Sequence, residues 1–129
     1  MTPPLTVLAL AVLLQAAQLG LAAILSDLDR GLRYNAGPRD GPPPPERPVT
    51  ARLKRAAANH GEALVLFAPA VLVAHLTVPT PFQTAAAWTY LAARVLYVPA
   101  YAGGWTPWRS VFWIAGFLAT VAVAISTLI

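Results

Sequence analysis

The chain contains no cysteine among its 129 residues. This absence excludes disulfide bonds, thiolate metal sites and a cysteine nucleophile, so any thiol chemistry must use a thiol that a substrate brings. Charged side chains are also scarce, at 11% of the residues. A soluble domain of this size carries about 25%. With so few charges the chain cannot form a solvated surface, and the composition excludes a water-soluble enzyme.

The charged residues that are present lie in one part of the chain. Residues 1–26 carry none, and after Glu62 only Arg94 and Arg109 remain. The formal net charge is +4, and the excess of base lies beside apolar runs. That position is typical of the cytoplasmic face of a membrane protein, so we expect a membrane partner and no nucleic acid.

Four apolar stretches take up most of the chain, at about 5–26, 54–78, 82–101 and 107–129. A bilayer core about 30 Å thick needs about 20 helical residues, so each stretch is long enough to cross it. The first stretch has no basic residues before it and exceeds the apolar part of a signal peptide, which favours a true span. The sequence predicts an all-α membrane protein, with a single four-transmembrane-helix domain over 1–129.

Residues 27–51 form the only long connection between these stretches, and their four-proline run cannot be helical. Seven basic residues lie in or beside this loop, whereas the connection at 78–81 and both chain ends carry none. By the positive-inside rule the loop is cytoplasmic, and four spans then put both termini on the opposite side. The start of the second span, the end of the third and the start of the fourth would share the cytoplasmic side with the loop.

A polar stripe opens the second span and consists of Arg52, Arg55, Asn59 and Glu62. This spacing places the four side chains within an arc of about 80° on one helical face. Glu62 lies about 15 Å into the helix. An ionisable side chain is costly there unless it has a partner, which is another helix, another protomer or a ligand. Two alternatives need no ligand. Asn59 and Glu62 would form hydrogen bonds between helices, or Arg52, Lys54 and Arg55 would anchor the helix start to lipid headgroups. We interpret Lys54 as such a headgroup anchor.

A second stripe lies on the third span and consists of Tyr90, Arg94, Tyr97 and Tyr101. A guanidinium offers a planar donor fork and a phenol a directional O–H, so this face suits an anion. Arg109 enters the fourth span from the same side. The membrane topology follows from the distribution of charge and not from the spacing of residues within the stripes. It nevertheless puts both stripes in the cytoplasmic half of the bilayer, so two independent arguments agree. The alternatives are an aromatic belt for the tyrosines and a lipid-facing, snorkelling position for Arg109.

Three further polar residues lie in the apolar stretches. Gln15 and Gln18 on the first span are expected to hydrogen-bond to another helix. His60 lies about 100° away from the stripe and has no companions at metal-ligand spacing, so we interpret it as structural and expect no metal site.

Two short motifs carry a family resemblance. They are Arg55-Ala-Ala-Ala-Asn59-His-Gly-Glu62 and Ala93-Arg94-Val-Leu-Tyr97-Val-Pro-Ala-Tyr101. Together, in order and on consecutive spans, they resemble motifs of the MAPEG superfamily, the membrane-associated proteins in eicosanoid and glutathione metabolism. The resemblance covers the whole chain, with its four spans and basic first loop. The segment 34–40 resembles a small bacterial branch, which implies the bacterial inner membrane.

The resemblance implies a homotrimer with glutathione, as co-substrate, bound between neighbouring protomers. The residues that it implies for glutathione binding are Arg33, Arg52, Arg55, Asn59, Glu62, Arg94, Tyr97 and Tyr101. Arg109 resembles an arginine that stabilises the thiolate, and Arg30 of the first loop is a second catalytic candidate near the same pocket. Glutathione offers two carboxylates and an ammonium, which several guanidinium groups and one carboxylate would match. A lipophilic electrophile would arrive from the bilayer.

These features favour a glutathione transferase or peroxidase that acts on lipophilic electrophiles. The alternative is a non-catalytic membrane protein that binds glutathione or lipid, or that keeps the polar stripe for assembly. A small transporter or channel is disfavoured, because the outer half of the predicted spans is almost wholly apolar. The chain departs from relatives at Ala63, where some have tyrosine, and at the Gly103–Pro107 connection, which changes the spacing to Arg109.

Overall fold

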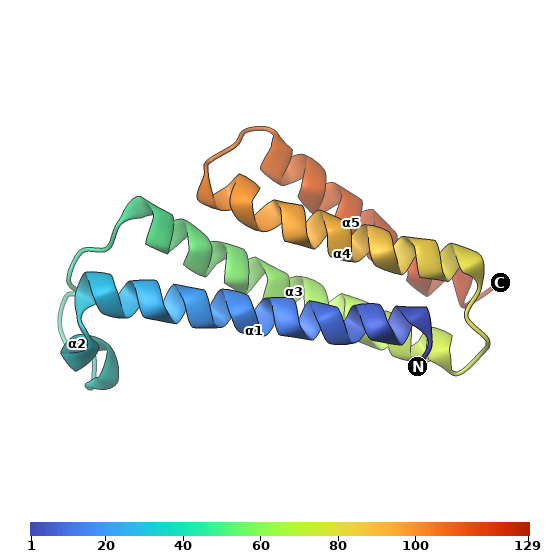
Figure 1. Cartoon of the computed structure of the whole chain (residues 1–129), viewed down its shortest axis with the longest axis horizontal. Helices are drawn as coiled ribbons and strands as arrows, with labels where there is room; N and C mark the ends of the chain where they lie inside the picture. Colours follow the sequence, from blue (N-terminus) through green and yellow to red (C-terminus); the bar gives the residue numbers. More distant parts are fainter.

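The computed structural model describes all 129 residues and contains five helices and no strands. They are α1 (Pro3–Arg30), α2 (Leu32–Ala36), α3 (Pro48–His75), α4 (Pro81–Ala102) and α5 (Trp108–Ser126). α1 packs against α3 and α4 against α5, while α3 also contacts both α4 and α5. Both termini and the α3–α4 connection lie at one end of the molecule, and α2 and the α4–α5 connection lie at the other (Figure 1). The start of α3, the end of α4 and the start of α5 therefore share one end, as the sequence predicts.

The helices extend beyond the apolar stretches on which the predicted spans rest. α1 continues to Arg30 instead of ending near residue 26, and α3 begins at Pro48 instead of near residue 54. α1 ends where Gly31 takes a φ of 89°, a conformation that favours glycine. α3 starts with Pro48, and proline is tolerated in the first turn of a helix because the backbone N–H groups there have no partner within the helix. Polar residues end the apolar run without ending the helix, so only Gly31 and residues 37–47 of the loop lie outside helices.

The α4–α5 connection is a tight turn that fixes where Arg109 enters α5. Gly104 adopts a φ of 66°, which a side chain would strain. The backbone N–H of Trp105 donates to the Ala100 carbonyl at 2.8 Å, and this hydrogen bond closes the end of α4. α5 then begins at Trp108, one residue after the start of the fourth apolar stretch.

The core between the long helices consists of small side chains around one aromatic pair. The rings of Phe67 and Tyr90 stack with centroids 3.7 Å apart and planes 6° from parallel. The other buried members are Val7, Ala11, Val71, Ala74, Ala87, Ala119 and Val123. Small residues let helix backbones approach closely, which is how helices associate in lipid, where burial of apolar surface gives little driving force.

Three of the long helices, α1, α3 and α5, are long and apolar enough to cross a membrane. α4 has 22 residues and a single charged side chain, Arg94. Its hydropathy is lower because glutamine, threonine and tyrosine interrupt its apolar run. Only 22–28% of the residues in the three apolar segments are buried inside the chain. Most of their apolar surface therefore faces outward, as expected of helices that contact lipid or further protein.

A buried polar contact joins α1 to α3. Gln15 Nε2 donates to the Ala57 carbonyl at 2.9 Å, and His60 Nδ1 lies 3.0 Å from both Gln18 Nε2 and Gln15 Oε1. His60 is fully buried. The predicted interhelical hydrogen bonds of the two glutamines and the structural interpretation of His60 are confirmed.

Hydrogen bonds to one carboxylate hold the first loop on the start of α3. Asp29 accepts from Thr50 Oγ1 at 2.5 Å, from the Arg47 backbone N–H at 3.0 Å and from Arg47 Nε at 2.7 Å. The Asp29 side chain is 7% exposed. A single carboxylate therefore satisfies one buried hydroxyl, one backbone donor at the helix start and one guanidinium.

We expect Asp29→Asn to lower the thermal unfolding temperature of the detergent-solubilised protein by several degrees. The amide keeps one acceptor oxygen but loses the charge and the second acceptor, so these three donors cannot all be paired. Differential scanning fluorimetry measures the change. Asp40→Asn is the matched control, since Asp40 is exposed and forms no ion pair. Equal melting of the two variants would show that the loop does not depend on Asp29.

Candidate functional site

The two predicted polar stripes face each other between α3 and α4. Arg94 Nη2 donates to Asn59 Oδ1 at 2.9 Å, and Arg55 Nε donates to the Tyr101 hydroxyl at 3.0 Å. Each bond joins one residue of α3 to one of α4. The structure thus brings together two sets of polar residues that lie about 40 positions apart in the sequence.

Arg94 is the most deeply placed charged residue of this region. It is 2% exposed, and its guanidinium carbon lies 4.2 Å from the centre of the Tyr97 ring. Its Nε has no hydrogen-bond partner, and no carboxylate lies within ion-pair distance. On α5, a Cβ at Gly116 would lie 3.3 Å from Arg94 Cδ, so the glycine lets α5 approach this side chain closely. A buried guanidinium without a counter-ion is costly and is suited to receive an anion.

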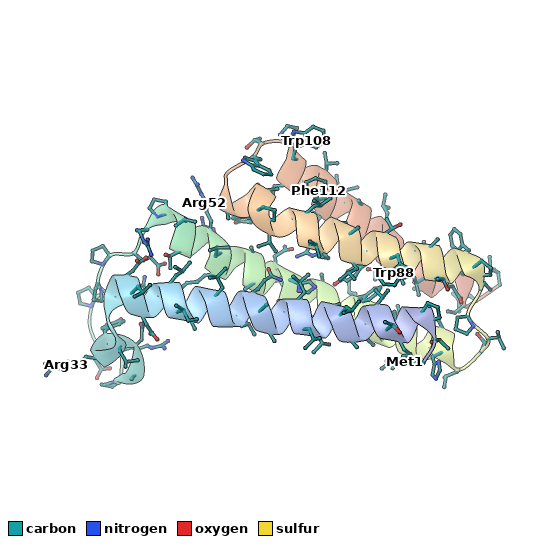
Figure 2. The ribbon with its side chains drawn as sticks, viewed as in Figure 1. Met1, Arg33, Arg52, Trp88, Trp108 and Phe112 are labelled. Atoms are coloured by element: carbon teal, nitrogen blue, oxygen red, sulfur yellow. The ribbon has the colours of Figure 1, made fainter.

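Three more arginines surround Tyr101 at the end of the molecule that carries the loop. The guanidinium carbons of Arg109 and Arg55 lie 4.9 Å and 5.8 Å from the centre of its ring. Arg52 Nη1 lies 3.4 Å from the Ala102 carbonyl at the end of α4. Figure 2 shows Arg52 at the start of α3, on the side of the α4–α5 connection. None of the three pairs with a carboxylate.

Two adjoining pockets lie between α3, α4 and α5. The polar pocket, of about 370 Å³, is lined by Asn59, Tyr97, Tyr101, Arg109, Ser110 and Trp113 and by Ile114. The inner pocket, of about 170 Å³, is lined at one end by Asn59, Glu62, Arg94 and Trp113, and further along by Leu66, Tyr90, Phe117 and Thr120. Asn59 and Trp113 line both pockets, so the two pockets meet at these residues.

Glu62 lines the inner pocket together with Arg94. It forms no ion pair within the chain. Its side chain is exposed in the single chain, so the carboxylate is accessible to a positively charged ligand group or to a neighbouring protomer. The pocket therefore offers both signs of charge at one end and apolar side chains at the other.

Arg30 and Arg33 lie apart from the two pockets in the single chain. Arg30 pairs with Glu46 at 3.4 Å, and Glu46 also accepts from Lys54 Nζ at 2.6 Å. Lys54 is therefore held by an internal ion pair, and its interpretation as a headgroup anchor stays a prediction. Arg33 lies on α2 at the tip of the molecule, away from α4 and α5 (Figure 2). A role for either arginine beside Arg109 requires the loop of a second copy.

α5 forms one side of the inner pocket, and neither predicted stripe contains a residue of this helix. Its residues are Trp113, Gly116, Phe117 and Thr120. Arg109, Trp113, Gly116 and Thr120 are spaced four, three and four residues apart, the same helical spacing as in the second stripe. That signal is present in the sequence, but a search based on polarity passes over it because the three positions after Arg109 carry no charge.

A comparison with known protein families identifies the family of this chain. The MAPEG family model matches residues 5–129. The chain belongs to the MAPEG family. The match covers nearly all of the chain, and with the apolar helices it indicates that this MAPEG protein is an integral membrane protein. No curated protein matches the sequence. The MAPEG chain has no cluster of histidine, aspartate and glutamate side chains that could hold a metal ion.

Proposed function

We propose that this MAPEG protein binds glutathione across the polar pocket and the charged end of the inner pocket, and uses its thiol to attack lipophilic electrophiles, as a transferase or peroxidase. One observation carries the proposal. Arg30, Arg47 and Lys54, in and beside the loop, are paired with acids, whereas Arg52, Arg55, Arg94 and Arg109 around the pockets have no carboxylate partner. Arg33 and Arg39 of the loop are also unpaired, but they are exposed and line neither pocket. Unpaired guanidinium groups that converge in a partly buried place favour an anionic ligand. Glutathione supplies two carboxylates and, when ionised, a thiolate.

Each group of the ligand has a complementary side chain. Arg55 and Arg94 would bind the carboxylates, Glu62 the ammonium, and Arg109 the sulfur. In a transferase reaction the thiolate sulfur bonds to an electrophilic carbon, the leaving group departs with the bonding electron pair, and the thiol proton passes to water. In a peroxidase reaction the sulfur attacks a peroxide oxygen and releases an alcohol. A second glutathione then forms the disulfide and water.

The proposal includes a homotrimer whose protomers cross the bacterial inner membrane with all four long helices. The outward-facing apolar surface of α1, α3 and α5 supports contacts with lipid and with neighbouring protomers. A neighbouring protomer would also bring Arg30 and Arg33 of its loop toward the polar pocket. The excess of base in the loop supports a cytoplasmic position for this end.

The alternative, a non-catalytic membrane protein, is supported by the two hydrogen bonds between α3 and α4 that involve Arg94 and Arg55. These bonds would stabilise the helices without any ligand. Isothermal titration of the detergent-solubilised protein with glutathione separates the proposals. Saturable binding together with conjugation of 1-chloro-2,4-dinitrobenzene supports the enzyme. Binding without turnover of any acceptor supports the alternative, and absence of binding excludes glutathione from both.

We expect Glu62→Gln to weaken glutathione binding about tenfold or more, because the substitution removes the carboxylate that pairs with the ammonium. A glutathione analogue that lacks the amino group should bind the variant and the unchanged protein equally. Titration of both proteins with both ligands measures the pairing directly. A loss of affinity of the same size for the two ligands would show that Glu62 does not contact the ammonium.

A further inference from the structure

Two basic residues of the first loop lie outside the pockets between α3, α4 and α5. Arg33 and Arg39 are exposed and form no ion pair. Both line a third pocket of about 440 Å³, which we call the loop pocket, together with Arg30, Tyr34 and Asp40. Arg30 already pairs with an acid. The two unpaired guanidinium groups outweigh the single carboxylate of Asp40, so the loop pocket attracts anions.

Hydrogen bonds to α1 hold Arg39 in place. Its Nε donates to the Asn35 carbonyl at 2.9 Å, and the Asn35 side chain donates to Ser26 and Asp27 of α1 at 3.1 Å and 2.8 Å. Arg39 is also the only residue other than glycine with a positive φ, at 57°. A side chain makes this conformation unfavourable, and it persists only where the surroundings hold it. The Nε bond leaves the two terminal nitrogens of the guanidinium for a ligand, so Arg39 presents a fixed donor pair.

α2 places the loop pocket at the side of the helices. It lies beside the loop end of α1, away from α4 and α5 (Figure 1), and packs against no helix other than α1. Its Leu32, next to Arg33, is 65% exposed, and Leu28 of α1 is 73% exposed. Apolar and basic side chains that are exposed together at the end of an apolar helix are typical of contact with a lipid leaflet.

We propose that the loop pocket binds the phosphate of an anionic phospholipid, with Arg39 as its principal donor and Arg33 beside it. The phosphate oxygens accept from the guanidinium groups, and the acyl chains contact the exposed leucines. A free phosphate ion offers the same oxygens but has no apolar part, so Leu28 and Leu32 favour the lipid. The inference needs the membrane position of the chain and does not depend on glutathione. Arg33 is also a candidate for the glutathione site of a neighbouring protomer, so the test changes Arg39.

Arg39→Gln removes the charge of the principal donor. Native mass spectrometry of the detergent-solubilised protein with dioleoyl-phosphatidylglycerol measures the result, and we expect the Kd of this lipid to rise about tenfold. Arg52→Gln is the matched control, because it removes one positive charge at the same end of the molecule and outside the loop pocket. It should change the Kd by less than about twofold. Equal losses in the two variants, or equal affinity of the unchanged protein for dioleoyl-phosphatidylcholine, would overturn the site.

Arg39→Lys separates the geometry of the donor from its charge. Lysine keeps the charge but loses both the bond to Asn35 and the paired donors, so we expect the Kd of phosphatidylglycerol to rise about threefold or more. Full affinity of this variant would overturn the fixed donor pair. The thermal unfolding curve shows whether each variant remains folded.

Two further measurements identify the ligand and keep the inference apart from the proposed function. Inorganic phosphate in about 100-fold excess over the lipid should leave phosphatidylglycerol bound, because the ion has no acyl chains. Displacement by the ion would overturn the lipid as the occupant. Arg39→Gln should bind glutathione as the unchanged protein does, and a parallel loss of glutathione and lipid would overturn a separate lipid site.

Discussion

Arg94→Lys is expected to weaken glutathione binding about 100-fold. The guanidinium donates to Asn59 at 2.9 Å, packs on Tyr97 at 4.2 Å and still has a free Nε. It can therefore hold its neighbour and a ligand carboxylate at the same time. A lysine keeps the charge but is a single point donor on a flexible stem, so it cannot make both contacts in this geometry.

Isothermal titration of the detergent-solubilised variant measures this loss, and the thermal unfolding curve shows whether the variant remains folded. Arg39→Lys is the matched control, because Arg39 is an exposed base of the loop that donates to the Asn35 carbonyl. It should bind glutathione as the unchanged protein does. An Arg94→Lys variant that is folded and binds with full affinity would show that Arg94 serves only to join α3 to α4.

Arg109→Ala is expected to lower kcat for conjugation about 100-fold or more, while the Kd of glutathione changes by less than about threefold. Arg109 lines the polar pocket, packs on Tyr101 at 4.9 Å and has no carboxylate partner. Its charge therefore remains available to stabilise the thiolate. Without it, the pH of half-maximal kcat should rise toward about 8.5, the ordinary value for a thiol.

Two variants control this prediction. Arg109→Lys keeps the charge and should recover part of the rate at neutral pH. Trp108→Phe alters the adjacent exposed residue at the start of α5 and should leave both kcat and its pH dependence unchanged. If Arg109→Ala loses affinity and rate in equal measure, Arg109 is a binding residue, and the thiolate must be stabilised by another group.

The meeting of the two stripes could be predicted from the sequence because it depends on local rules. Helical periodicity puts Arg55 and Asn59 on one face of α3 and Arg94 and Tyr101 on one face of α4. The distribution of basic residues sets the direction of each helix, and hence the end at which both stripes lie. The exact pairs, such as Arg94 with Asn59, depend on how deeply the helices interlock, which these rules do not fix.

The loop and α5 show where such rules stop. Lys54 pairs with Glu46 because of the path that the loop takes between α2 and α3, and no periodic pattern describes that path. The end of α1 depends on the backbone conformation of Gly31, not on the polarity of its neighbours. Trp113 of α5 shares a helical face with Arg109, but an apolar side chain in an apolar helix is not distinguished from its neighbours by polarity, so its place in the pockets is found from the geometry.

Gly116 couples the two pockets mechanically. With no side chain at this position, the backbone of α5 rests against Arg94, and packed interiors transmit displacement with little loss. α5 also carries Trp113 and Phe117, whose stacked rings, 5.3 Å apart, form a wall of the inner pocket. A bound carboxylate that displaced Arg94 would therefore have to displace this wall as well. If the proposed function is correct, the first substrate to arrive would then change the shape that the second one meets.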